Sequence, residues 1–539
     1  MNAIHVTESL RDGILSGFFT GATVSAMATT ASPAAPAARR PVNRATLYTF
    51  GAFGGILFGY DLGVIAGVLV LITKQWQLSA FQKGVITASL SVGAMLGAML
   101  AGRLCDLIGR KRTIMLAAVV VIIGTVGCAL AGGWTVMMVT RGVIGIGVGL
   151  SSATVPAYLA ELAPARTRGA LGSLNQLFIV TGILSAFLTD YALSGHENWK
   201  GMFLGALVPA AILLGGLMVL PETPRWLLAK GRDAEARAVL TATRPGASAE
   251  ELDAEIGDIR DIIRRDTEER GRIRDLWQPW LRPMVIVALI LAVGQQFSGV
   301  NAINAYFPTM LKSLGFATRT ALLSAVVLGV VKFLFTVWEL FVVDRWGRKP
   351  LLTVGAAVMV VALFAAGLVI KNVHDKNTLG TMTLIFLILY LAGYELGWGA
   401  TVWVMIGEIF PLRERAAGTG VATTVLWAAT GLVTAVFPTM SAKNHLGIGG
   451  AMWVFAGVNV VLLLLARFYI PETKGRSLEQ IERDLRHGEL AGSGPGAGVG
   501  AGAGTGAGTG AGTGVGEPAR ADADHPLEVP GEVGLIPES

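Results

Sequence analysis

Long apolar runs separated by short polar stretches dominate the chain between residues 46 and 470. A helix needs about 20 apolar residues to cross the hydrocarbon core of a bilayer, so runs of this length predict membrane spans. Two groups of six such runs predict an all-α membrane protein with twelve transmembrane helices in two six-helix bundles. The runs are 46–71, 84–103, 113–132, 137–158, 170–192 and 202–220, followed by 283–307, 321–343, 350–371, 383–407, 417–440 and 449–470.

Polar segments divide and flank the two groups. The stretch between them is rich in Arg, Asp and Glu at helical spacing, which predicts a cytosolic helical linker. Near the C-terminus, a Gly/Ala/Thr repeat from about residue 490 has little to pack and predicts disorder. The expected domains are a disordered 1–44, an N-terminal bundle at 45–220, the linker at 221–282, a C-terminal bundle at 283–470 and a cytosolic tail at 471–539.

Orientation and chain start follow from charge placement. With the N-terminus inside, the inner short loops carry eleven Lys and Arg residues against eight in the outer loops, which favours cytoplasmic termini. The abundance of Arg, Ala and Gly hints at a bacterial plasma membrane protein. The apolar stretch 13–28 makes a poor signal peptide, and we hypothesise that translation starts at Met27.

Composition narrows the function class. Of 539 residues, 53% are hydrophobic and 15% are charged, whereas soluble domains carry about 25% charged residues. This excludes a cytosolic enzyme, and the scattered basic residues (net charge +6) exclude a nucleic-acid binder. The sequence holds no phosphate-binding loop, metal-ligand cluster or catalytic triad, so we expect transport without a cofactor or metal. Cys105 and Cys128 are expected to act as small hydrophobic residues, and a monomer is sufficient.

The two halves repeat each other at their predicted inner ends. GRLCDLIGRK after the second run matches DRWGRK after the eighth, and Pro-Glu-Thr follows both the sixth and the twelfth. Internal repeats of this kind are typical of secondary transporters that work by alternating access. Charges at the membrane boundary can gate such a protein, although they can also simply fix topology. The predicted gating residues are Asp106, Arg110, Glu161, Arg168, Asp344, Arg348, Glu408 and Arg415.

Two ionisable residues lie within predicted spans of the first half. Asp61 is in the first span and Arg141 is in the fourth, both toward the outer side. Ionisable residues inside the membrane are costly and usually functional. A carboxylate whose charge depends on an arginine partner suits a proton carrier, so we predict proton coupling by this pair. The alternative is a structural buried ion pair.

Amide side chains gather at mid-depth in two spans. The fifth span has Asn175 and Gln176, and the seventh has Gln295, Gln296 and Asn301. Amides donate and accept hydrogen bonds, which suits hydroxyl-rich ligands, and the indole of Trp403 suits the apolar face of a sugar ring. The alternative is hydrogen bonding between helices.

The sequence resembles the sugar porter family of the major facilitator superfamily over about 45–485. The resemblance rests on GRLCDLIGRK, DRWGRK, PAYLAELAPARTRG, PETPRWL and PETKGRSLEQIE. It implies a twelve-helix transporter that moves monosaccharides by rocking two bundles. Asp61 and Arg141 then match the proton-coupling pair of the family's symporters. The implied sugar contacts are Phe58, Gln176, Gln295, Gln296, Asn301 and Trp403.

Several positions depart from that family pattern. A tyrosine pair is reduced to Ala305-Tyr306, a proline in the tenth span is Ala400, the amide before Trp427 is Leu426, and a typical asparagine in the eighth span is Lys332. A lysine at mid-membrane costs about 2.5–3.5 kcal/mol, so Lys332 needs a partner. That partner is expected to be Glu339, Glu395 or an acidic substrate such as a sugar acid, and Lys332 is therefore included among the candidate substrate contacts.

The sequence thus predicts a secondary active transporter that moves a monosaccharide or related polar solute with protons. Its partners are the small-molecule substrate, protons and the lipid bilayer. Two other functions stay open: a transporter or exporter of another small polar metabolite, such as a polyol, sugar acid or glycosylated product, and a sugar sensor that does not transport.

Overall fold

The apolar runs form helices, as their length and composition predict. The computed structural model describes residues 44–162, 168–244, 246–268, 273–411 and 414–474, and all regular structure within these ranges is helical. Twelve of the described helical segments are long and apolar enough to cross a membrane, which confirms the predicted number of spans. The predicted start at Met27, the disordered N-terminal region and the glycine-rich tail lie outside the described residues.

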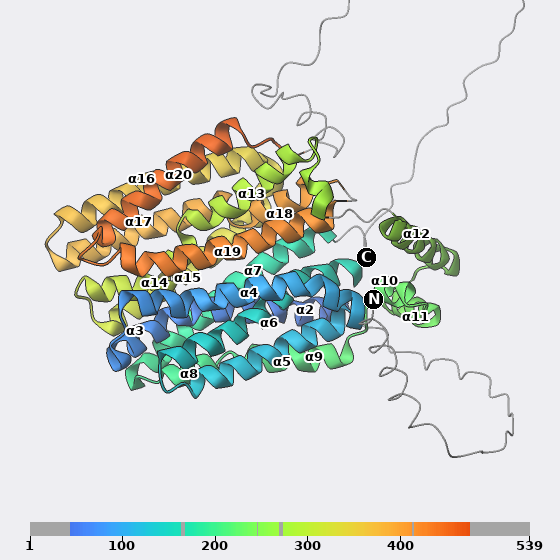
Figure 1. The fold of residues 1–539 in the computed structure, drawn as a ribbon, viewed down its shortest axis with the longest axis horizontal. Coiled ribbons are helices and arrows are strands. Elements are labelled where there is room, and N and C mark those ends of the chain that lie inside the picture. Colours follow the sequence, from blue (N-terminus) through green and yellow to red (C-terminus); the bar gives the residue numbers. More distant parts are fainter. Residues whose placement is uncertain (1–43, 163–167, 245, 269–272, 412–413, 475–539) are drawn as a thin grey trace, which may run out of the picture. The chain divides into compact units, whose positions relative to one another are not determined.

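The first six spans lie together in Figure 1, coloured blue to green. The first, Phe53–Trp76, combines parts of two helices that meet at Val64, and the sixth, Trp199–Val219, is also made of two helices. The helices are α2 (Arg44–Gly63), α3 (Ile65–Trp76), α4 (Ala80–Ile108), α5 (Arg110–Ala129), α6 (Trp134–Leu162), α7 (Arg168–Leu193), α8 (Trp199–Leu204) and α9 (Leu207–Val219).

The second six spans repeat this arrangement, with interruptions in the seventh and tenth. The tenth span begins at Lys376 rather than at the expected residue 383, because the side chain of Asp375 caps the helix by accepting from the Thr378 backbone N–H. The helices are α13 (Arg282–Phe297), α14 (Val300–Ser313), α15 (Thr318–Trp346), α16 (Arg348–Asn372), α17 (Lys376–Gly397), α18 (Ala400–Ile409), α19 (Arg415–Met440) and α20 (Gly447–Phe468).

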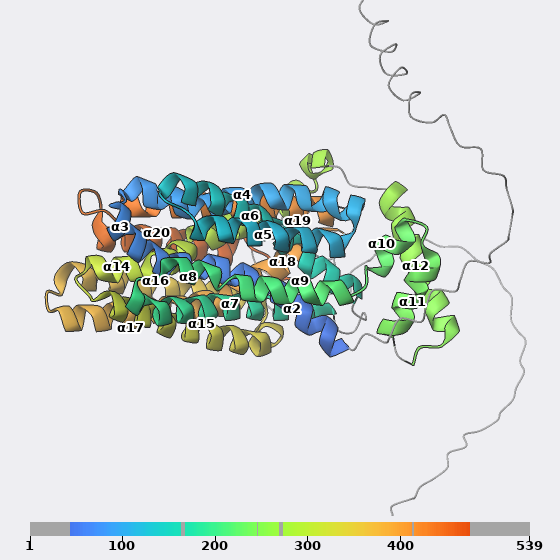
Figure 2. The same ribbon diagram turned by 90° about the horizontal axis from the view of Figure 1, so that it is seen from below.

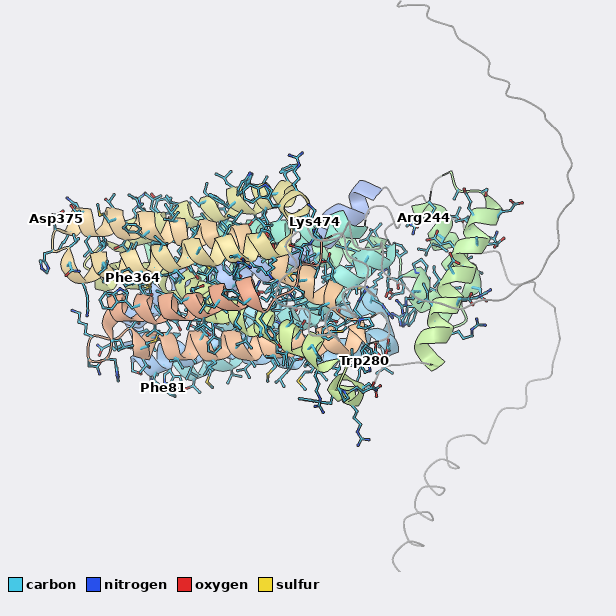
Figure 3. All side chains as sticks on the ribbon, turned by 90° about the horizontal axis from the view of Figure 1, so that it is seen from above. Phe81, Arg244, Trp280, Phe364, Asp375 and Lys474 are labelled. Carbon is cyan, nitrogen blue, oxygen red and sulfur yellow. The ribbon has the colours of Figure 1, made fainter. Side chains whose placement is uncertain are left out.

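Between the bundles, the described part of the polar linker contains three α-helices. These are α10 (Pro224–Ala229), α11 (Asp233–Thr243) and α12 (Ala249–Glu268), and Figure 2 shows them grouped together. Arg244 donates to the carbonyl of Leu162 at 2.9 Å, so this group adjoins the end of α6. Figure 3 places Arg244 and Lys474 toward one end of the molecule and Asp375 at the other, and we call the Asp375 end the remote end.

Glycines bring neighbouring helices into close contact. A side chain at Gly93 or Gly97 of α4 would collide with the backbone of α6, and one at Gly145 or Gly149 of α6 would collide with α4. Both pairs have the four-residue spacing that lets helices approach closely in membranes. The α4–α6 pair is therefore a rigid support for Arg141, which α6 carries.

The repeated inner-loop motif forms the same structure in both halves. In the first half, Gly109 has a φ of +96°, and α5 begins directly after it. The Glu222 carboxylate accepts from the backbone N–H groups of Arg110 and Lys111, so it satisfies the start of α5. Burial raises the pKa of Glu222 above its ordinary value, and these donors oppose that rise. Arg110 also pairs with Glu161 at 3.2 Å.

The second half repeats each of these contacts. Gly347 has a φ of +92°, Glu472 accepts from the N–H groups of Arg348 and Lys349, and Arg348 pairs with Glu408 at 3.2 Å. The predicted gating charges that the structure pairs therefore join helices of the same bundle. Of the other gating candidates, the Arg415 side chain donates to the Phe410 carbonyl and the Asp106 carbonyl accepts from the Trp226 indole. The side chains of Arg168 and Asp344 lie outside the described residues.

We expect Gly109→Ala to lower the free energy of unfolding by roughly 1–3 kcal/mol, because the backbone there is left-handed. The new methyl group would also lie against the Glu222 carboxylate. Gly215→Ala on α9 is the control: its methyl group meets open space, and Ala favours the helix by up to about 1 kcal/mol. Thermal unfolding of the purified variants measures both. Equal melting temperatures for the two variants would contradict the strain expected from a side chain at Gly109.

Candidate transport site

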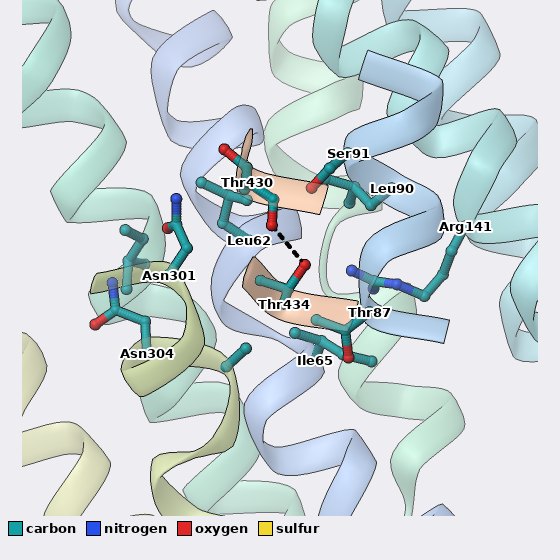
Figure 4. A pocket seen from close by; sticks show the side chains of 12 residues that line it. Leu62, Ile65, Thr87, Leu90, Ser91, Arg141, Asn301, Asn304, Thr430 and Thr434 are labelled. Carbon is teal, nitrogen blue, oxygen red and sulfur yellow. Dashed lines mark hydrogen bonds between the residues drawn. The ribbon is translucent and has the colours of Figure 1, made fainter. Parts of the chain in front are cut away.

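A pocket lies between the two bundles, lined by residues from seven helices. Figure 4 shows Arg141 on one side of it and Asn301 and Asn304 on the other. The polar lining residues are Thr87, Ser91, Arg141, Asn301, Asn304, Thr430 and Thr434, and the apolar ones are Leu62, Ile65, Leu90, Ile183 and Ala305. Hydroxyls, amides and one guanidinium group give this pocket donors and acceptors for a polar, hydroxyl-bearing solute.

Asp61 and Arg141 are both buried, each with 1% of its surface exposed. Within the part of the chain that the structure describes, neither Asp61 oxygen has a hydrogen-bond partner, and the same is true of Nε and Nη1 of Arg141. The two groups are close enough to interact electrostatically, and the guanidinium also lies 6.0 Å from the ring centroid of Phe203. The two side chains are therefore a buried carboxyl group and a buried guanidinium group that interact electrostatically, with no hydrogen bond from Arg141 to either Asp61 oxygen.

The amides of the seventh span form a chain of hydrogen bonds that leads away from the pocket. Asn301, which lines the pocket, donates to Gln296, and Gln296 donates to Gln295 at 3.0 Å. Gln295 in turn donates to the carbonyls of Trp398 and Gly399 at 2.7 and 3.0 Å. Substrate contact and hydrogen bonding between helices were the two interpretations of these amides, and the structure displays the second for Gln295.

The remaining predicted sugar contacts are more dispersed. Phe58 of α2 packs against Trp427 of α19, with ring centroids 5.5 Å apart, so this aromatic contact joins the two bundles. Trp403 on α18 is 36% exposed, and Gln176 on α7 is partly exposed. Of the predicted site residues, Arg141 and Asn301 line the pocket.

Lys332 forms a buried ion pair with Glu395, one of its two predicted protein partners. Its Nζ lies 3.1 Å from Oε1 of Glu395, and the two side chains are 6% and 0% exposed. The Thr336 hydroxyl donates to the other oxygen of Glu395 at 3.0 Å. Glu339, the other candidate, instead accepts from the backbone N–H groups of Ala400 and Thr401.

Polar residues of the pocket that the sequence analysis missed share a helical spacing. Thr87 and Ser91 are four residues apart, as are Thr430 and Thr434, and Asn304 follows Asn301 by three. Such spacing places each pair on one helix face. A search for polar pairs at this spacing inside apolar runs would have found them.

The two bundles meet closely at the remote end. The Tyr306 hydroxyl of α14 lies 3.1 Å from the Lys83 carbonyl of α4 and 2.9 Å from the Thr434 carbonyl of α19. A side chain at Gly84 would collide with the backbone of Ala435. The structure thus brings the bundles together at the end opposite the linker helices.

Comparisons with known proteins agree with this architecture. The family model described as "Sugar (and other) transporter" matches residues 47–485. The chain is 37% identical to the glucose transporter GlcP of Staphylococcus epidermidis, over 82% of this chain and 98% of that protein. It is 35% identical to the galactose-proton symporter of Escherichia coli K12, over 81% and 93%.

Among solved structures, the inward-open conformation of the xylose transporter XylE from E. coli superimposes with a TM-score of 0.70 at 28% identity, covering 81% of this chain and 99% of XylE. The family-model match over residues 47–485 includes both bundles. Fold, family model and relatives agree: this chain belongs to the sugar porter family of the major facilitator superfamily.

Proposed function

We propose that this transporter carries a neutral monosaccharide or polyol with protons, and that Lys332 does not serve an acidic substrate. The single observation that carries this proposal is the ion pair between Lys332 and Glu395. Because the ammonium group already has a buried counter-ion, an anionic substrate would have to displace Glu395 and leave that carboxylate unpaired in the membrane. Such an exchange costs several kcal/mol.

Asp61 is proposed as the proton-binding group and Arg141 as the group that senses its charge. The support is the burial of both side chains and the absence of hydrogen-bond partners on the Asp61 oxygens among the described residues. A carboxyl group without competing donors is available to bind and release a proton. Arg141 also lines the pocket, so the proton site and the solute share one side chain.

The substrate is proposed to bind among Asn301, Gln296 and the other polar residues of the pocket, with Phe58, Gln176, Gln295 and Trp403 completing the contacts as the bundles move. Amides and hydroxyls that both donate and accept hydrogen bonds suit neutral hydroxyl-bearing solutes. Relatives whose names specify glucose, D-xylose, galactose with protons, and myo-inositol identify the compounds to test first.

The inner-end charges are proposed to hold each bundle rigid while the bundles separate and rejoin. Arg110–Glu161 and Arg348–Glu408 join neighbouring helices within a bundle, which supports rocking of two stiff bodies. We further propose a bacterial cell membrane location with both termini cytoplasmic, on the basis of the loop charges, and a monomer as the working unit.

Uptake into proteoliposomes under an imposed inward proton gradient tests the proposal. The panel is D-glucose, D-galactose, D-xylose and myo-inositol as neutral compounds and D-glucuronate as the acidic one. We expect accumulation of at least one neutral compound, collapse of that accumulation with a protonophore, and no accumulation of D-glucuronate. Accumulation of D-glucuronate that Lys332→Asn abolishes would instead establish the acidic-substrate role of Lys332.

A further inference from the structure

The tenth span is broken at Trp398–Gly399, and the break leaves polar backbone groups inside the membrane. Helix α17 ends at Gly397, and α18 starts at Ala400. The first N–H groups of any helix lack partners in the helix itself, and in lipid each one must be satisfied by another part of the protein. Gly399 occupies the capping position and makes no side-chain cap.

Glu339 of α15 supplies the missing acceptors. Its carboxylate accepts from the Ala400 N–H at 3.2 Å, from the Thr401 N–H at 3.2 Å and from the Thr401 hydroxyl at 3.1 Å. Glu339 is 1% exposed. An anion at a helix N-terminus also interacts favourably with the helix dipole. A side chain from the eighth span therefore caps the second half of the tenth.

The other side of the break is held by donors. Gln295 of α13 donates to the carbonyls of Trp398 and Gly399, and the Trp398 indole donates to the Leu352 carbonyl of α16 at 3.0 Å. The backbone carbonyls and N–H groups at the break thus bond to α13 and α15, and the Trp398 side chain bonds to α16. Through Gln296 and Asn301, the Gln295 side is also connected to the pocket.

Two buried carboxylates face the break, and each of them interacts with a positive group. A side chain at Gly399 would lie 2.9 Å from an oxygen of Glu395 and 3.3 Å from an oxygen of Glu339, so both carboxylates face the break. Lys332 balances Glu395, and the N-terminus of α18 balances Glu339. Tyr394 completes the surroundings, with its ring centroid 5.5 Å from Nζ of Lys332.

We propose that Glu339 is a positioning residue that holds the N-terminus of α18 at the hinge of the tenth span. With this contact in place, α18 moves as one rigid helix when solute occupies the pocket. It acts through α18, which carries Trp403, and does not itself line the pocket. The inference rests on the transport function proposed above, but its structural part is testable without any substrate.

Amide hydrogen exchange of the full-length protein in nanodiscs tests the hinge directly. In Glu339→Gln we expect the peptide covering 400–404 to exchange about tenfold faster, because a neutral amide oxygen replaces the charged acceptor and the hydrogen bonds weaken, with the other spans unchanged. Thr336→Val is the matched control, because it removes a buried hydrogen bond on the same helix that leads to Glu395 instead of α18. Unchanged exchange at 400–404, or equal acceleration in every span, would overturn the proposal.

Transport kinetics separate positioning from a general structural role. With the neutral compound that wild type carries best, we expect Glu339→Gln to lower the turnover number about tenfold while KM stays within about threefold. Thr401→Val, which removes only the hydroxyl donor, is the milder second variant if Glu339→Gln does not fold, and its turnover number is expected to fall less. A variant that raises KM at unchanged turnover, or Thr401→Val with wild-type exchange and turnover, would refute the hinge. Absence of transport by wild type would refute the proposed function and leave the exchange result standing.

Discussion

Asp61→Asn is expected to abolish proton-driven accumulation while sugar exchange across the membrane continues. A membrane potential of 100 mV supplies about 2.3 kcal/mol for each proton, which supports roughly fifty-fold accumulation of a neutral solute. Asparagine keeps the size of the side chain but cannot bind and release a proton. The accumulation ratio should therefore fall from about fifty to one, whereas counterflow of labelled sugar against unlabelled sugar should remain.

The chain contains a matched control for this experiment in Asp190 of α7. Like Asp61 it is 1% exposed and lies in the first bundle, but one of its oxygens accepts from the Gly67 N–H at 3.0 Å. If proton coupling requires a carboxyl group free of such a donor, Asp190→Asn should keep the accumulation ratio of wild type. Accumulation that survives in Asp61→Asn removes Asp61 as the proton site, and loss in both variants would point to burial alone.

The sequence predicted those features that depend on local pattern. Run length determined the number of spans, because each must cross the same hydrocarbon thickness. The repeated motifs revealed the internal duplication. Because charged residues are rare inside membranes, Asp61, Arg141 and Lys332 could be recognised as candidates. Each of these inferences needs only the neighbouring residues and the solvent around a helix.

Features that depend on contacts between helices could not be predicted in the same way. Lys332 had two acidic candidates, and only the packing of α15 against α17 brings Glu395 rather than Glu339 within 3.1 Å. Glu222 was visible as part of a repeated motif, but its role as a cap requires the first residues of α5 to lie beside it. The break at Gly399 likewise depends on acceptors and donors from three other helices.

Because the two halves are repeats, the two bundles have the same structure at their inner ends, although we propose different functions for them. Glu222 and Glu472 cap equivalent helices, and Gly109 and Gly347 take the same left-handed backbone, so both inner ends are built alike. The membrane interior has diverged instead. In the first bundle, both Asp61 oxygens and two of the Arg141 nitrogens have no hydrogen-bond partner among the described residues, whereas in the second Lys332 lies 3.1 Å from Glu395 in an ion pair. This asymmetry supports the proposal that the first bundle binds the proton and that the charges of the second are structural.

Lys332→Met is expected to lower the free energy of unfolding by about 3–5 kcal/mol, because it leaves Glu395 as a buried charge without its counter-ion. Lys332→Met combined with Glu395→Gln removes both charges and should restore most of that loss, since replacing a whole buried pair is often close to neutral. Thermal or denaturant unfolding of the two single variants and the double variant gives the coupling between the residues.

The exposed pair Lys74–Glu197 provides the comparison that isolates burial. Its atoms are 3.3 Å apart, much like the 3.1 Å of Lys332–Glu395, but its side chains are 72% and 68% exposed. Water solvates either charge once its partner is gone, so Lys74→Met should cost less than about 1 kcal/mol. If Lys332→Met costs as little as Lys74→Met, Glu395 does not carry an uncompensated charge in that variant. The ion pair with Glu395 would then no longer be a reason to exclude an acidic substrate at Lys332.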